Sequence, residues 1–209
     1  PPRIRAGSRM IAALKADKPE GECSGAQRDA CIKQVNEHAR YLASLSPESS
    51  QGAQMKARLL LAIGQPKEAA EVLRSACENT VDRVGCCMLR VQIARELKDG
   101  PAMDELLKQL AGWGCSDARS CVSTWSWIGD FNASAGNAGA AVNAYERAAE
   151  RSPGGPALWM KLGNAASKIG AHARAVQAFE RALARKPGDT VILELLRTER
   201  SRLSLGQGF

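Results

Sequence analysis

Seven cysteines and two histidines are the residues of this 209-residue chain whose types could carry redox or metal chemistry. Cysteines that lie close together at the ends of expected helices are typical of disulfides that close loops in an oxidising compartment. The sequence predicts three such local disulfides and one leftover thiol, with the choice between Cys86 and Cys87 left open. The three groups are Cys23 with Cys31, Cys77 with Cys86 or Cys87, and Cys115 with Cys121.

Two other uses of the cysteines compete with disulfides. Zinc sites need Cys-x2-Cys hooks or closely spaced Cys and His, but the chain has no such hook and only His38 and His172, so no metal or cofactor is expected. Cysteine is also among the most buried residue types, so seven reduced thiols inside a cytosolic protein are an alternative. The disulfide interpretation instead implies an extracytoplasmic location, in the periplasm or associated with the outer membrane.

The sequence contains no pattern typical of an active site. There is no Gly-rich phosphate loop, no Gly-x-Ser-x-Gly elbow and no His-Glu-x2-His helix. We expect both histidines at the surface and assign no catalytic residue. The one enzymatic alternative is a nucleophile made from the unpaired cysteine, which would need a cleft and a perturbed thiol.

Composition excludes further classes of function. No run approaches the roughly 18 apolar residues that a membrane span needs, so a lipid anchor or membrane domain is expected only outside this chain. The net charge of +7 would suit an acidic partner or phosphate. Basic residues near helix ends, however, also complement the helix dipole without any partner. Four of the nine aromatic residues, Trp125, Tyr145, Trp159 and Phe179, fall at repeat positions, so we expect no base-stacking platform and no nucleic-acid partner.

Eight positions recur at one constant offset, the step from Trp125 to Trp159, which we call the repeat period. Small residues at two of them allow a close helix crossing, the later glycines end the first helix, and the aromatic fills the space between helix pairs. The first set is Trp125, Ile128, Gly129, Gly136, Ala141, Tyr145, Ala148 and Pro153, and the second is Trp159, Leu162, Gly163, Gly170, Ala175, Phe179, Ala182 and Pro187.

This pattern resembles the tetratricopeptide repeat family, whose repeat spans about 34 residues and whose signature is Trp-x2-Leu-Gly-x2-Tyr, then Ala-x3-Phe, then Pro. Asn132 and Ala166 replace the tyrosine of the first helix. The resemblance implies an all-α, right-handed α-solenoid of tetratricopeptide-type helix pairs with flanking capping helices. The expected domains are N-terminal capping helices over 1–49, four repeats over 50–189 (50–83, a divergent 84–121, 122–155 and 156–189), and a C-terminal capping helix and tail over 190–209.

Weaker patterns flank the two clear repeats. A helical stripe from Ile4 to Leu14 indicates a short first helix, and the divergent repeat is expected to leave through a loop at Gly112 and Gly114. Asp189 is the expected N-cap of the last helix, which carries its leucines on one face and Arg and Glu on the other.

The resemblance also implies a partner-binding concave face, built from the first helix of each repeat. The exposed indoles of Trp113 and Trp127 are both expected as anchors for a partner. The alternative for Trp127 is that its indole packs beneath a neighbouring helix. The expected partner-binding residues are Gln54, Arg58, Arg90, Ser126, Trp127, Asp130, Met160, Lys161 and Asn164.

The resulting prediction is a non-enzymatic scaffold that binds a peptide or partner protein, in the assembly of a bacterial envelope complex, as part of a lipoprotein or similar extracytoplasmic protein. The alternative is a regulatory or sensor module of a larger signalling protein. An enzyme that uses the unpaired cysteine ranks below both.

Overall fold

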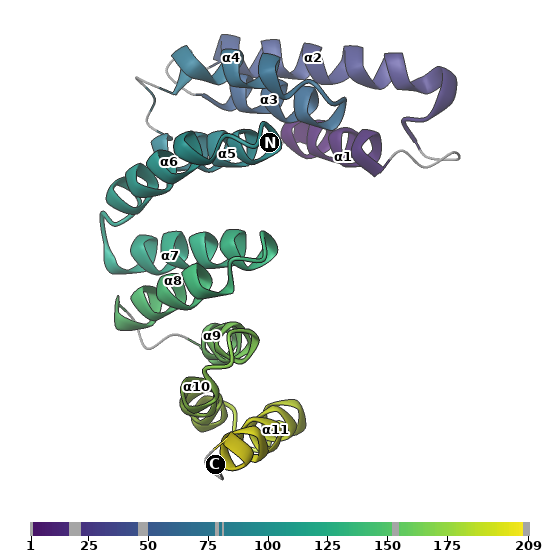
Figure 1. Ribbon diagram of the computed structural model, residues 1–209. Helices are drawn as coiled ribbons and strands as arrows, with labels where there is room; N and C mark the ends of the chain where they lie inside the picture. Colours follow the sequence, from purple (N-terminus) through teal and green to yellow (C-terminus); the bar gives the residue numbers. More distant parts are fainter. Residues whose placement is uncertain are drawn as a thin grey trace. The chain divides into compact units, whose positions relative to one another are not determined.

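The computed structural model is helical throughout the residues it describes (Figure 1). They form eleven α-helices and one short 3-10 helix, with no strand, so the expected all-α class is confirmed. None of these helices is long and apolar enough to cross a bilayer. The chain divides into two compact units, 1–113 and 114–209, each described by itself. The described residues are 2–16, 22–45, 50–77, 80, 82–151 and 155–206.

Unit 1 contains six α-helices, and their starting residues explain where several of them begin. Pro66 takes the first position of α4, where its missing N–H is not needed, and Asp82 caps α5 by accepting a hydrogen bond from the Gly85 amide at 3.1 Å. The bounds are α1 Pro2–Ala16, α2 Arg28–Leu45, α3 Gln51–Ala62, α4 Pro66–Ala76, α5 Arg83–Glu96 and α6 Gly100–Trp113, with the 3-10 helix Gly25–Gln27 before α2.

Two apolar clusters hold unit 1 together. The first joins α1, α2 and α3 around Leu14, Val35 and Leu59. The second joins α3, α4 and α5 around Leu73 and Leu89. The short helix expected near the N-terminus is therefore present as α1. The loop expected at Gly112 was wrong in part, because α6 continues through that glycine to Trp113.

Three disulfides close the helix junctions that the cysteine spacing indicated. They join Cys23 to Cys31, Cys77 to Cys86 and Cys115 to Cys121, with Cα–Cα separations of 5.8, 5.7 and 4.0 Å. Cys87 is the free cysteine. One residue further along a helix turns a side chain by about 100°, so Cys87 points away from Cys77, and its thiol donates to the Leu106 carbonyl at 3.3 Å.

Cys87 should be unreactive in the folded protein. It is 1% exposed, and burial raises the pKa of its thiol to about 11 against the smaller opposing effect of Arg90, so only about one thiol in a thousand is ionised at pH 8. Titration with Ellman's reagent is expected to find no thiol in the native chain and one per chain in denaturant. Three or more thiols after denaturation would contradict the disulfides, and a fast-reacting native thiol would contradict this burial.

Unit 2 contains two helix pairs and a fifth helix, stacked one after another (Figure 1). We call the first helix of a pair helix A (α3, α5, α7, α9) and the second helix B (α4, α6, α8, α10). One continuous core runs through the unit around Tyr145, Trp159 and Phe179. The bounds are α7 Ala118–Ser134, α8 Ala138–Arg151, α9 Pro156–Lys168, α10 His172–Arg185 and α11 Thr190–Gly206.

The repeat period corresponds to a repeated close crossing of helices A and B. Gly163 lies under the ring of Phe179, and a Cβ atom at this glycine would lie 2.5 Å from the ring's Cε1. Gly129 lies in the same way under Tyr145. A methylene at either position would overlap the aromatic ring, so the crossing requires glycine.

The ends of the A helices also follow the prediction. Gly136 and Gly170 have φ of 81° and 73°, the left-handed conformation that ends a helix cheaply only at glycine. Helix α10 ends at Arg185, two residues before Pro187. Pro153, expected to end the preceding B helix, lies outside the described residues.

Helix α11 continues the register of the A helices. Ile192 and Leu196, which stand one repeat period after Leu158 and Leu162, are buried in the same core. Asp189 caps the helix as expected, because its Oδ1 accepts hydrogen bonds from the Val191 and Ile192 amides at 3.0 and 3.1 Å. The residue at the crossing position of Gly129 and Gly163 is here Arg197, which is exposed.

Candidate functional site

A hollow of about 210 Å³ in unit 1 brings together two of the expected partner-binding residues. Gln54 and Arg58 of α3 lie one helical turn apart on one of its walls. The opposite lining is partly apolar and comes from α1 and α2, and the start of α5 adds a carboxylate. Besides Gln54 and Arg58, the lining includes Ile4, Ile11, Leu42 and Asp82.

Gln54 differs from the exposed groove residue that the sequence predicts. It is 6% exposed, and its amide nitrogen donates to Ser50 Oγ at 2.8 Å and to Asp82 Oδ2 at 2.9 Å. The Ser50 amide in turn donates to Thr80 Oγ1 at 3.2 Å. Gln54 thus ties α3 to the loop that Cys77 and Cys86 close, and it shapes the floor of the hollow, whereas Arg58 is exposed.

Arg90 does not line the hollow that contains Gln54 and Arg58. It lines a different hollow, of about 180 Å³, between α4, α5 and α6. In unit 2, Trp159 occupies the position comparable to that of Arg90 and lines a hollow of about 250 Å³ between α8, α9 and α10. Because the divergent repeat does not keep the repeat period, the fixed register predicted the wrong side of α5 for Arg90.

In unit 2 the expected residues of α7 and α9 meet at Asp130. Its Oδ1 accepts a hydrogen bond from the Tyr145 hydroxyl at 2.8 Å, and its Oδ2 lies 2.7 Å from Lys161 Nζ. Burial, together with the hydrogen bond and charge of Asp130, raises the pKa of Tyr145, so the phenol stays protonated. The ion pair with Lys161 balances the negative charge of the Asp130 carboxylate at this point of the surface.

The other expected residues of unit 2 form a mixed polar and apolar surface. Asn164 is exposed, Ser126 is partly buried, and Met160 is partly buried against the core. Trp127 stacks on Phe131 of its own helix, with ring centroids 5.5 Å apart and planes at 18°. This indole packs within α7 and is only partly buried, while Trp113 of unit 1 is 41% exposed.

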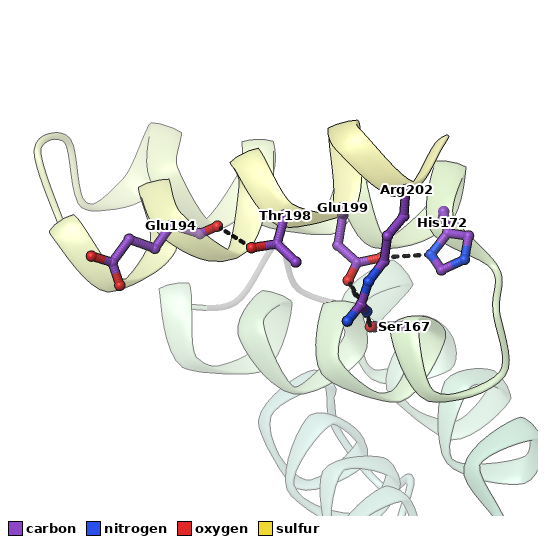
Figure 2. Close-up of polar contacts among 6 residues, drawn as sticks. All are labelled: Ser167, His172, Glu194, Thr198, Glu199 and Arg202. Atoms are coloured by element: carbon purple, nitrogen blue, oxygen red, sulfur yellow. Dashed lines mark hydrogen bonds and ion pairs between the residues drawn. The ribbon is translucent and has the colours of Figure 1, made fainter. Parts of the chain in front are cut away.

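Sequence reasoning missed two residues of this surface. Glu194 and Thr198 of α11 stand one repeat period after Met160 and Asn164, and both are exposed. Thr198 Oγ1 donates to the Glu194 carbonyl at 2.9 Å (Figure 2). Extending the repeat period by one more step would have found both. We define the A-helix face of unit 2 by its six residues Ser126, Asp130, Met160, Asn164, Glu194 and Thr198.

A buried carboxylate fixes α11, and hence the last third of this face, to the preceding pair. Glu199 is 3% exposed, contrary to the exposed position expected for the acidic residues of this helix. Its Oε1 accepts from Ser167 Oγ at 2.7 Å and Arg202 Nη1 at 2.9 Å, and its Oε2 accepts from His172 Nδ1 at 2.7 Å (Figure 2). His172 therefore has a structural partner in α11.

The pKa of Glu199 reflects two opposing effects. Burial raises it, but the hydrogen bonds from His172 and Ser167 and the charge of Arg202 together outweigh burial and hold it below its ordinary value. The carboxylate is therefore ionised at neutral pH. Within the described residues, no three His, Cys, Asp or Glu side chains lie close enough to hold a metal ion.

Comparison with known proteins supports the repeat assignment. The sequence model of the tetratricopeptide repeat family matches residues 133–190. A search of curated proteins finds no significant match.

Solved structures resemble most of the chain. The C-terminal part of a TPR repeat-containing protein from Cytophaga hutchinsonii matches with a TM-score of 0.61 and 14% identity, over 86% of this chain and 72% of that one. MamA matches at 0.53 and 15%, over 87% and 92%. YrrB, described as a TPR protein with an unusual peptide-binding site, matches with a TM-score of 0.50 and 11% identity, over 79% of this chain and 84% of that one. At such identities the likeness establishes the fold alone, an all-α helical-repeat architecture, within which residues 133–190 match the tetratricopeptide repeat.

Proposed function

We propose that this chain is a non-enzymatic scaffold that binds a peptide segment or helix of a partner protein along the A-helix face of unit 2. The tetratricopeptide fold itself supports a protein–protein interaction role. The observation that carries the proposal further is that three successive A-type helices present side chains at the same two positions of the repeat period, of which the second is exposed in all three helices. A regular ladder of this kind suits a partner backbone that runs across the helices.

The chemistry of the face defines the kind of segment that it suits. Met160 and the indole of Trp127 offer apolar contact, while Asn164 and Thr198 offer hydrogen bonds. Lys161 neutralises Asp130, so the central part of the face carries no net charge. Together with the exposed carboxylate of Glu194, this combination favours a mainly polar segment with one or two apolar anchors over a highly charged one.

Two observations support an extracytoplasmic scaffold, in the assembly of an envelope complex, in preference to the alternatives. Six of the seven cysteines pair in disulfides, which form and persist in oxidising compartments. The thiol that an enzyme would need as a nucleophile belongs to Cys87, which is buried and has a raised pKa. No observation specifically favours a sensor module.

Site-specific photo-crosslinking tests the binding face. A benzophenone amino acid at Asn164 is expected to crosslink a partner from the native envelope fraction, whereas the same group at Asn143, an exposed asparagine of helix B (α8), is not. With that partner purified, Asn164→Ala combined with Met160→Ala should weaken binding about tenfold, as loss of contacts worth about 1 to 2 kcal/mol would. Asn143→Ala should leave the affinity unchanged, and circular dichroism should show all variants folded. Equal crosslinking from both positions would contradict the proposal.

A further inference from the structure

The three disulfides differ in how far their sulfur-bearing residues are exposed. In the two disulfides of unit 1, both half-cystines are buried. In the disulfide of unit 2, Cys121 is buried but Cys115 is partly exposed, which makes it the only half-cystine of the three pairs that solvent reaches to this extent. The exposed fractions of the buried half-cystines are 3% for Cys23, 7% for Cys31, 6% for Cys77, 0% for Cys86 and 3% for Cys121.

The exposed disulfide also opens into a hollow on unit 2. The space amounts to about 490 Å³, and both half-cystines contribute to its wall. The remaining lining consists of Asp117 and Ala118 at the start of α7 and of Glu150 and Arg151 at the end of α8. A reagent can therefore approach this disulfide through a depression, without any rearrangement of the core.

We propose that Cys115–Cys121 is a site of thiol–disulfide exchange with an external dithiol, which the other two disulfides are not. A thiolate of the dithiol attacks Sγ of Cys115, the partly exposed half-cystine, and a mixed disulfide forms as the bond to Cys121 breaks. The sulfur of Cys121 leaves as a thiolate in the first turn of α7, at the positive end of the helix dipole, and then takes up a proton.

The second step completes the redox balance. The other thiol of the reagent, as its thiolate, attacks the reagent's own sulfur in the mixed disulfide and releases Cys115, which also takes up a proton. Two electrons and two protons pass from the dithiol to the protein, so the reagent ends as a disulfide and the protein as two thiols. An external disulfide reverses the same steps.

The surrounding contacts allow this exchange without loss of the fold. Thr124 Oγ1 donates to the Gly114 carbonyl at 3.1 Å, and Asp117 Oδ1 accepts from the Ser120 amide at 3.0 Å. These bonds hold the segment before α7 in place when the covalent link opens. Cys87 lies in unit 1 with its thiol bonded to Leu106, so it does not compete for the released sulfurs.

Partial reduction of the full chain tests the proposal. Native protein is treated with graded dithiothreitol, trapped with N-ethylmaleimide and mapped by mass spectrometry. Cys115 and Cys121 are expected to label at least tenfold faster than the cysteines of the other two pairs. Simultaneous reduction of all three pairs, or earlier reduction of either pair in unit 1, would overturn the proposal. In a second arm of the experiment, a protein dithiol with a surface Cys-x-x-Cys motif replaces dithiothreitol. Labelling of Cys115 and Cys121 in that arm would extend the exchange to protein reductants.

A charge variant supplies an independent readout. Asp117 and Glu150 outnumber Arg151 around the hollow, so an incoming thiolate meets a net negative edge. Glu150→Gln is therefore expected to raise the exchange rate about twofold at low ionic strength, and added salt should remove the difference. Glu105→Gln, an exposed change in α6 of unit 1, is the matched control and should have no effect. A rate that ignores both Glu150 and salt would show that the reductant does not enter through this hollow.

Discussion

Gly163→Ala is expected to lower the free energy of unfolding by about 3 kcal/mol. Alanine is the better helix former by about 1 kcal/mol, so helix propensity alone predicts a gain. The new methyl group would, however, lie 2.5 Å from Cε1 and 2.8 Å from Cδ1 of Phe179, which is fully buried and cannot move aside without displacing α10. Denaturant unfolding followed by tryptophan fluorescence, with the disulfides intact, measures the change.

A matched glycine in the same unit serves as the control for Gly163→Ala. Nothing lies within 4 Å of a Cβ atom placed at Gly139 in α8, so Gly139→Ala should stabilise the protein by about 0.5 to 1 kcal/mol. The double variant Gly163→Ala, Phe179→Leu should recover part of the loss, because leucine frees space at the crossing. A Gly163→Ala protein as stable as the parent would contradict the close crossing.

Glu199→Ala is expected to destabilise unit 2 by about 2 to 3 kcal/mol and to detach α11. The change removes a buried carboxylate that accepts three hydrogen bonds and leaves His172 and Arg202 without their partner. Because these two side chains are partly exposed, water compensates some of the loss. Hydrogen exchange of the α11 amides should accelerate more than that of α7. Glu194→Ala, an exposed change on the same helix, should be neutral within about 0.5 kcal/mol.

The pH dependence of this effect has a defined sign. The pKa of Glu199 in the folded protein lies below its ordinary value of 4.5, so its contribution to stability is fully present above that pH and is lost as the pH falls through the folded pKa. The difference in stability between the parent and Glu199→Ala should therefore be constant near neutrality and should shrink in acid. A difference that grows below pH 4 would contradict an ionised, hydrogen-bonded carboxylate.

The parts of the fold that the sequence predicts well are those with a strict local spacing. Gly129, Gly163 and their aromatic partners recur at a fixed interval because each crossing imposes the same steric demand, so α7 to α10 and their turns follow from the pattern. The cysteine groups follow as well, because short loops bring their members together. Which cysteine of the adjacent pair is bonded depends on the rotation of α5 about its axis, which spacing alone does not determine.

The candidate site was harder to predict where its residues depend on distant partners. Gln54 is buried because Asp82, far along the chain, accepts its hydrogen bond, and no local pattern encodes that pairing. Glu199 looks like a surface residue in sequence, yet Ser167, His172 and Arg202 satisfy its buried charge. Arg90 was misplaced because the repeat period was applied to a repeat of another length.

The exposed arginine of α11 sets a limit on further stacking. At the equivalent points of α7 and α9 even one additional carbon would overlap an aromatic ring, so a side chain as long as that of Arg197 rules out the same crossing there. A helix that packs at this point of α11 therefore needs a wider crossing than those at Gly129 and Gly163. The charged, exposed side chain of Arg197 thus makes this point of α11 a poor docking site for a further helix or for the end of another copy of the chain.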